Sequence, residues 1–154
     1  MDDVTGAAFR AATAADWPQV AALLTVVRLP LDGAEAHVDD FVLAERDGAI
    51  VGCAGLERYG HAALLRSVAV RADSQGRGLG EILVHRVLAH AAANGVETVA
   101  LLTTTAAGFF PRFGFRAVER ATVPATLQTS VEFRAACPAS ATAMVLDVRH
   151  AGLP

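Results

Sequence analysis

Three glycines at positions 76, 78 and 80 alternate with other residues, between a run of strand-forming residues and a run with helical spacing. Backbone N–H groups in such a loop, together with the positive end of the following helix dipole, can surround an anion. Glycine lets the main chain approach a diphosphate without a Cβ in the way, and Arg77 adds a positive charge. The loop therefore predicts a diphosphate site.

The spacing of the glycines separates this loop from two common nucleotide-binding motifs. It reads GxGxG, whereas the dinucleotide fingerprint reads GxGxxG near the start of a βαβ unit. The phosphate-binding loop of nucleoside triphosphatases needs a lysine, and this chain has none. A plain nucleotide or dinucleotide binder is kept as an alternative.

Strand-like and helix-like patterns alternate along the chain, which favours an α/β or α+β fold. Strands are expected over residues 9–12, 41–46, 49–58, 62–70, 96–103, 115–120 and 141–148. The first helix is expected to begin at a capping box formed by Thr13 and Asp16 and to run to Val27. Two more helices are expected over residues 81–93 and 106–113, and Pro111 must either kink the last one or delay its start. Residues 122–140 have no clear pattern. The sum is a mixed sheet of six or seven strands with about four helices.

Composition narrows the class of protein. A chain of 154 residues, 53% hydrophobic and 19% charged, is expected to fold as a single domain over residues 1–154. A formal charge of −3 gives no attraction to nucleic acid or to anionic membranes, and no apolar run is long enough to span a bilayer.

The acidic start, Met1 to Asp3, is unlike a signal peptide and predicts a cytoplasmic protein. Cys53 and Cys137 stand far apart, so we expect buried thiols and no metal site.

The segment Gln75–Gly80 resembles the Q/R-x-x-G-x-G/A pyrophosphate loop of the GNAT N-acetyltransferases. The resemblance extends from Phe9 to Val148 and includes Phe110–Phe115, which is similar to the family's aromatic-x-x-x-Gly-Phe segment. Within the family, the chain looks like the arsenic-resistance N-acetyltransferases, a branch similar to amino-acid N-acetyltransferases such as N-acetylglutamate synthase. The segments that carry this second resemblance are Gly55–Gly60, Leu64–Val70, Leu101–Thr105, Glu132–Arg134 and Cys137–Ser140.

The resemblance implies a GNAT fold with acetyl-CoA as the acetyl donor. The diphosphate would lie on the glycine loop, and the pantetheine would run beside the strand before it, whose amides would polarise the thioester carbonyl. Two positions depart from the family pattern, because Phe110 stands where many members have a tyrosine and Thr103 where many have an asparagine. The implied cofactor contacts are Val68, Ala69, Val70, Gln75, Gly76, Arg77, Gly78, Leu79, Gly80, Glu81, Thr103 and Phe110.

The reaction needs a group that accepts a proton, because an amino group with a pKa near 8 is mostly protonated at neutral pH. Glu57 is the first candidate for this base and Glu45 the second, and Tyr59 is the candidate acid that replaces the missing tyrosine. An anionic acceptor would suit the forked cation of arginine. The predicted acceptor-binding residues are Arg66, Ser67, Thr104, Arg134 and Ser140.

The sequence thus predicts transfer of an acetyl group to the amine of a small, anionic, amino-acid-like molecule, including analogues that contain arsenic or phosphorus. Acetylation of a protein or peptide, and a non-catalytic acyl-CoA sensor, are the alternatives. The apolar segment Ala143–Val148 is compatible with a homodimer that pairs through its last strands.

Overall fold

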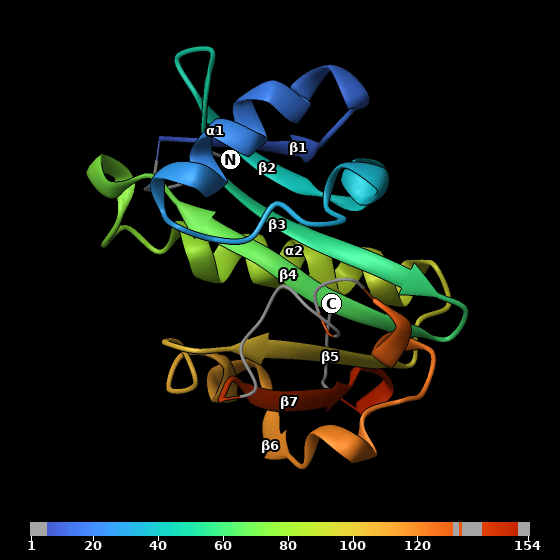
Figure 1. Cartoon of the computed structure of the whole chain (residues 1–154). Helices are drawn as coiled ribbons and strands as arrows, with labels where there is room; N and C mark the ends of the chain where they lie inside the picture. The colour runs from blue at the N-terminus through green and yellow to red at the C-terminus, as the bar shows by residue number, and fades with distance from the viewer. Residues whose placement is uncertain (1–5, 131–132, 134–139, 151–154) are drawn as a thin grey trace.

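Seven strands form one mixed sheet in the order β1-β2-β3-β4-β5-β7-β6 (Figure 1). The computed structural model describes residues 6–130, 133 and 140–150. Strands β4 and β5 are parallel, and every other neighbouring pair is antiparallel. The strands are β1 (Ala8–Ala11), β2 (Val42–Arg46), β3 (Ala49–Tyr59), β4 (Ala62–Val70), β5 (Thr98–Thr103), β6 (Arg116–Val118) and β7 (Thr142–Asp147). The mixed α/β sheet predicted from the sequence is confirmed.

Two α-helices cover opposite faces of this sheet, α1 (Trp17–Val26) and α2 (Leu79–Ala93) (Figure 1). Successive side chains of a strand point to opposite faces. Leu43 and Cys53, which pair with each other, accordingly pack in one cluster with α1, whereas the adjacent pair Val42 and Ala54 packs in another cluster with α2. No helix in the described part of the chain is long and apolar enough to cross a membrane.

The expected helix over 106–113 is reduced to the 3₁₀ helix η4 (Phe110–Phe113). Pro111 lies at its start, where a missing N–H group is tolerated, so the proline delays the helix instead of kinking it. Gly114 ends it with φ of 99°, in the left-handed region that favours glycine. The remaining short helices are η1 (Ala14–Asp16), η2 (Glu35–Asp40), η3 (Ala72–Ser74), η5 (Arg120–Thr122), η6 (Leu127–Thr129) and η8 (Val148–His150).

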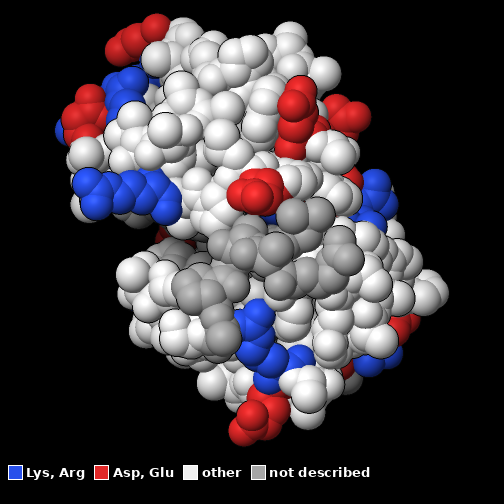
Figure 2. Space-filling model, in the orientation of Figure 1, with Lys and Arg blue, Asp and Glu red and all other residues white. Residues whose placement is uncertain are grey.

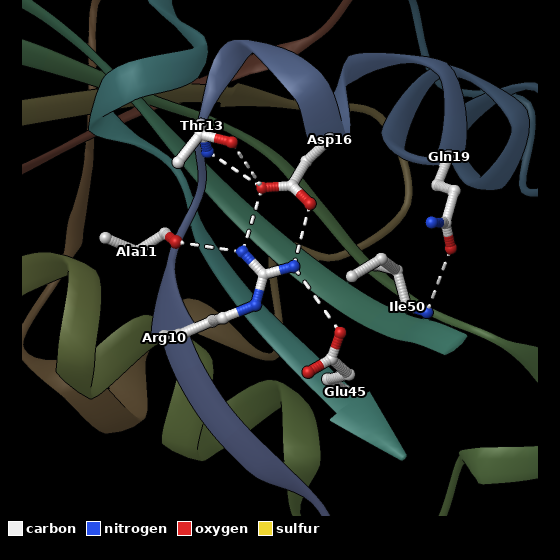
Figure 3. Close-up of polar contacts among 7 residues, drawn as sticks. All are labelled: Arg10, Ala11, Thr13, Asp16, Gln19, Glu45 and Ile50. Atoms are coloured by element: carbon white, nitrogen blue, oxygen red, sulfur yellow. Dashed lines mark hydrogen bonds and ion pairs between the residues drawn. The ribbon is translucent and has the colours of Figure 1, made fainter. Parts of the chain in front are cut away.

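An ion pair joins edge strand β1 to the start of the first helical segment (Figure 3). Arg10 donates from Nη1 and Nη2 to the two carboxylate oxygens of Asp16, at 2.8 and 2.7 Å. The same carboxylate accepts from the backbone N–H of Thr13 at 2.8 Å, which completes the predicted capping box. These hydrogen bonds hold the pKa of Asp16 well below its usual range.

Asp16→Asn is expected to lower the free energy of unfolding by about 1–3 kcal/mol near pH 7, because a charged acceptor of four donors is lost. An acid whose pKa is lowered by folding stabilises the fold above about pH 4, its ordinary pKa, and the contribution is lost as the pH falls further. Urea unfolding should therefore show a smaller difference between wild type and variant at about pH 3 than at about pH 7.

Asp39→Asn is the control, because Asp39 is exposed and has no ion pair or hydrogen bond to a side chain among the described residues. It should leave the unfolding free energy within about 0.5 kcal/mol of wild type. An Asp16→Asn difference that stays constant with pH would contradict this account of the pair.

Candidate active site

The candidate site begins where the two parallel strands of the sheet stop pairing. Residues Ala62–Leu64 of β4 pair with Thr98–Ala100 of β5, and no further pair joins these two strands in the described structure. Beyond that point the two strands line a cavity of about 370 Å³. Ligands of open sheets commonly bind at the carboxyl ends of parallel strands, and this cavity has that position. Its described lining is Arg28, Leu29, Pro30, Leu65, Arg66, Ser67, Val68, Leu101, Leu102, Thr103, Thr104, Thr105, Ala106 and Phe110.

A β-bulge in β4 faces this cavity. Ala69 pairs with Cys53 and Arg66 pairs with Gly55, so two residues, Ser67 and Val68, stand opposite one residue of β3. Ser67 has φ of 59°, which is uncommon for a residue other than glycine. The Sγ of buried Cys53 donates to the Ser67 carbonyl oxygen at 3.1 Å. At the bulge, backbone N–H and C=O groups of β4 beside the cavity do not follow the regular hydrogen-bonding pattern of the sheet.

The glycine loop and the first turn of α2 form a second cavity of about 240 Å³, which we call the phosphate cradle. Its lining is Val70, Gln75, Gly76, Gly78, Leu79, Gly80, Glu81, Phe109 and Arg112. Gly78 precedes the helix with φ of 81°, and the first helical bond in this turn runs from the Ile82 N–H to the Gly78 oxygen. The amides before Ile82 therefore have no partner within the helix and can receive an anion.

Two residues of the phosphate cradle were not expected from the sequence, Phe109 and Arg112. The Arg112 guanidinium lies 4.5 Å from the centre of the Phe109 ring and donates to the Phe109 carbonyl oxygen at 2.8 Å. Arg112 also lies 3.4 Å from Glu81, a long and exposed ion pair. Neither residue stands out in the sequence, because only the turn of η4 brings Phe109 and Arg112 to the start of α2.

The predicted base, Glu57, lies in a buried polar cluster on β3. Its Oε1 accepts from the Tyr59 hydroxyl at 2.5 Å and from the Ser130 hydroxyl at 2.9 Å, and its Oε2 accepts from Arg66 Nη1 at 2.7 Å. Burial raises the pKa of the Glu57 carboxyl, but these three hydrogen bonds together bring it below its ordinary value. A carboxylate held ionised in this way is a weak proton acceptor, and its role as a base stays a prediction.

The predicted acceptor-binding residue Arg66 belongs to the same cluster. Its side chain is fully buried, and besides Glu57 it donates to the carbonyl oxygens of Asp32 and Pro30 at 2.7 and 3.1 Å and to the Ser67 hydroxyl at 3.1 Å. Arg66 therefore joins β4 to the loop that follows α1. The exposed guanidine group on the cavity lining comes instead from Arg28, a residue that sequence reasoning missed.

Most of the site residues predicted from the sequence line one of the two cavities. The phosphate cradle takes Val70, Gln75, Gly76, Gly78, Leu79, Gly80 and Glu81, and the cavity between the strands takes Val68, Thr103, Phe110, Arg66, Ser67 and Thr104. Thr103 also accepts from the Ala106 N–H at 2.9 Å, so it stabilises the turn after β5. Neither lining includes Glu45, Glu57, Tyr59, Ala69, Arg77 or Ser140, and Arg134 and Cys137 lie outside the described residues.

Charged side chains of both signs are scattered around one face of the molecule, with uncharged surface between them (Figure 2). Within residues 6–130, 133 and 140–150, no three His, Cys, Asp or Glu side chains lie close enough to hold a metal ion.

Comparisons with known proteins agree with this geometry. A model of the acetyltransferase (GNAT) domain matches residues 37–117, slightly more than half of the chain. An uncharacterized N-acetyltransferase of Chlorobaculum tepidum is 34% identical over 89 residues, which are 57% of each protein. An amino-acid acetyltransferase of Pasteurella multocida is 28% identical over 124 residues, which cover 75% of this chain and 28% of the relative. The chain thus spans between about a quarter and somewhat over half of these relatives.

A solved structure has the same fold along nearly its whole length. Rv2747 from Mycobacterium tuberculosis, in complex with CoA and a second ligand, matches with a TM-score of 0.76 and 25% identity. The match covers 91% of this chain and 98% of that one.

The sole tyrosine, Tyr59, allows a direct test of the buried cluster. Burial and the adjacent Glu57 carboxylate raise the pKa of Tyr59 to about 12. Ultraviolet absorbance at about pH 11 should therefore show no more than about a tenth of the tyrosine as phenolate while circular dichroism reports a folded chain. In the chain unfolded in urea, the Tyr59 phenol should titrate near pH 10, the ordinary pKa of tyrosine. A folded protein whose phenol titrates near pH 10 would contradict the cluster.

Proposed function

The chain belongs to the acetyltransferase (GNAT) domain family, and from that premise we propose that it transfers acetyl from acetyl-CoA to the amine of a small, anionic, amino-acid-like molecule. One observation carries the proposal: the phosphate cradle and the cavity between β4 and β5 follow one another along the same strand. Val70 lines the first and Val68 the second, about 7 Å apart at the usual rise of a strand. A long molecule with a diphosphate near one end fits this arrangement.

The donor in this proposal lies along the end of β4. The amides from Gln75 to Glu81 receive the diphosphate, with Arg77 and Arg112 as nearby cations. The pantetheine runs beside Val68, Ala69 and Val70 towards Thr103 and Phe110. Backbone N–H groups of the bulge face the thioester oxygen, where each donor in such sites contributes about 3–4 kcal/mol to the transition state. The CoA complex of the Mycobacterium tuberculosis neighbour supports this assignment.

The chemistry needs little acid help. The neutral amine attacks the thioester carbon and the new C–N bond forms; the C–S bond then breaks, the nitrogen loses a proton to solvent, and the thiolate takes one up. A thiol with a pKa near 8.5 is a good leaving group, so Phe110 in place of a tyrosine need not prevent turnover. The ammonium form of the acceptor must first lose one proton, for which Glu57, directly or through water, was the sequence-based candidate.

Arg28 is the residue that favours an anionic acceptor. It lines the cavity, its side chain is exposed, and it has no ion pair or hydrogen bond from its guanidinium among the described residues. A guanidinium binds two oxygens of a carboxylate, phosphinate or arsinate at once. An analogue containing arsenic or phosphorus is therefore the narrower form of this proposal, and the name of the Pasteurella multocida relative supports an amino acid.

A non-catalytic acyl-CoA sensor is the second candidate, because the hydrogen bonds to Glu57 leave no strong base in the described cluster. A small cavity with one exposed cation is less suited to acetylation of a protein or peptide. The segment Ala143–Val148, expected to join two protomers, lies mostly in β7, which pairs with β5 on one side and β6 on the other and so has no free edge. A homodimer would therefore pair through the edge of β6, and this arrangement and a cytoplasmic location complete the proposal.

The test is acetyl-CoA-dependent thiol release across amino acids, glutamate analogues with phosphinate or arsinate groups, polyamines and short peptides. Release with an anionic amino acid is the expected result. Release only with peptides would contradict the proposed acceptor, and CoA binding with no release for any amine would favour the sensor.

Arg28→Gln should raise the KM for the anionic acceptor about tenfold to a hundredfold, because a charge-assisted pair is lost. The affinity for CoA, measured by calorimetry, should not change. Arg86→Gln is the control, because Arg86 is exposed on α2 and lines neither cavity. Equal KM values for wild type and Arg28→Gln would remove Arg28 from the acceptor site.

A further inference from the structure

We infer that the buried Arg66–Glu57 pair is a clamp that holds the loop after α1 in place, so that Arg66 positions Arg28 for the acceptor without binding the acceptor itself. We call residues 28–32 the rim loop and the Arg66–Glu57 pair the clamp. The inference rests on the proposed function only where it refers to the acceptor, because the clamp itself can be tested without turnover.

Arg66 reaches the rim loop through two backbone carbonyls. Its Nη1 donates to the Asp32 oxygen at 2.7 Å and its Nη2 to the Pro30 oxygen at 3.1 Å, across 34 and 36 residues of sequence. The Arg66 side chain is 0% exposed. A planar guanidinium presents several donors in fixed directions, so it can hold two carbonyls and a carboxylate in one geometry.

The rim loop has few other hydrogen bonds to the rest of the fold. Its backbone bonds are local: the Arg28 N–H donates to the Thr25 oxygen, the Leu29 N–H to the Leu24 oxygen, and the Leu31 oxygen accepts from the Ala34 N–H. Among the described residues, Arg66 supplies the hydrogen bonds that join the rim loop to the sheet. Packing of Leu29 against the α1 cluster adds an apolar contact.

Arg28 lies where the C-terminal cap of α1 passes into the rim loop. Its φ of 63° is in the left-handed region, and the hydrogen bonds from the Arg28 and Leu29 N–H groups to α1 form a Schellman motif that closes the helix. The cap fixes the Arg28 backbone on the helix side, and the clamp fixes the chain on the other side. Pro30, two residues later, is fixed by the clamp, and Arg28, Leu29 and Pro30 all line the cavity. Loosening the clamp would therefore let Arg28 leave the cavity lining.

Glu57 keeps Arg66 in place from the other side. Its carboxylate receives hydrogen bonds from Arg66, Tyr59 and Ser130, and His37 Nε2 lies 3.7 Å away. Arg66 also donates to the hydroxyl of Ser67 at the bulge. The clamp thus joins the acceptor side of the cavity to the strand proposed to hold the thioester, which fixes the distance between the two reactants.

The test must avoid leaving one buried charge without its partner, because that alone can unfold a protein. The variant is therefore Glu57→Gln with Arg66→Met, which removes both charges together. Hydrogen exchange is the first readout, and the amides of residues 28, 29 and 34 should exchange at least about tenfold faster than in the wild type. Asp16→Asn is the matched control: it removes another partly buried ion pair but makes no contact with the rim loop. Its rim loop should exchange as in the wild type.

Kinetics give the second readout. The clamp variant should raise the KM for the acceptor about tenfold or more, while the affinity for CoA, measured by calorimetry, stays within about twofold of the wild type. Combined with Arg28→Gln, it should raise KM no further than Arg28→Gln alone, because both act through one contact.

Unchanged exchange in the rim loop would overturn the clamp, whatever the activity. Additive effects of the clamp variant and Arg28→Gln would also overturn the inference, because Arg66 would then contact the acceptor itself. Accelerated exchange with no turnover in any variant, the wild type included, would support the clamp and count against the proposed function alone.

Discussion

Strands β4 and β5 stop pairing after Leu64 and Ala100, and the candidate site is arranged around the gap that this leaves. Backbone groups at such a gap need other partners or a ligand, since unpaired buried groups are unfavourable. The bulge at Ser67 meets part of this need, because its carbonyl accepts from Cys53. The rest of the gap is a cavity open to a substrate, with the phosphate cradle at its far end along β4.

The buried Arg66–Glu57 ion pair fixes the position of the loop after α1 relative to the sheet. Taking Arg66 and Glu57 out of water is unfavourable, and their attraction compensates only when the remaining donors and acceptors are also satisfied. Here the surplus donors of Arg66 go to the carbonyls of Pro30 and Asp32, and the surplus acceptor sites of Glu57 go to Tyr59 and Ser130. Completing the pair therefore requires the loop after α1 and the end of η6 to approach β3 and β4 in one arrangement.

Local patterns in the sequence predicted most of the fold. Periodicity located the seven strands and both α-helices, and the GxGxG spacing placed the phosphate cradle, since each depends on neighbouring residues. Long-range contacts were harder to predict. Glu57 pairs with Leu64, which puts Arg66 diagonally across from it, so their contact follows from the exact register of the β3–β4 hairpin, which the sequence pattern alone does not give. Arg28 carries no local signal, because only the path of its loop brings it to the cavity. The roles of individual site residues, an arsenic-containing acceptor and a dimer remain predictions.

The central claim is that one CoA molecule occupies the phosphate cradle and the gap beside the bulge together. Nuclear magnetic resonance of the ¹⁵N-labelled chain during a CoA titration tests it most directly. The account predicts that the amides of Gln75–Glu81 and of Ser67–Val70 shift with a single dissociation constant, while those of β1 stay unchanged. Saturable shifts confined to other elements, or two unrelated constants for the cradle and the bulge, would contradict it.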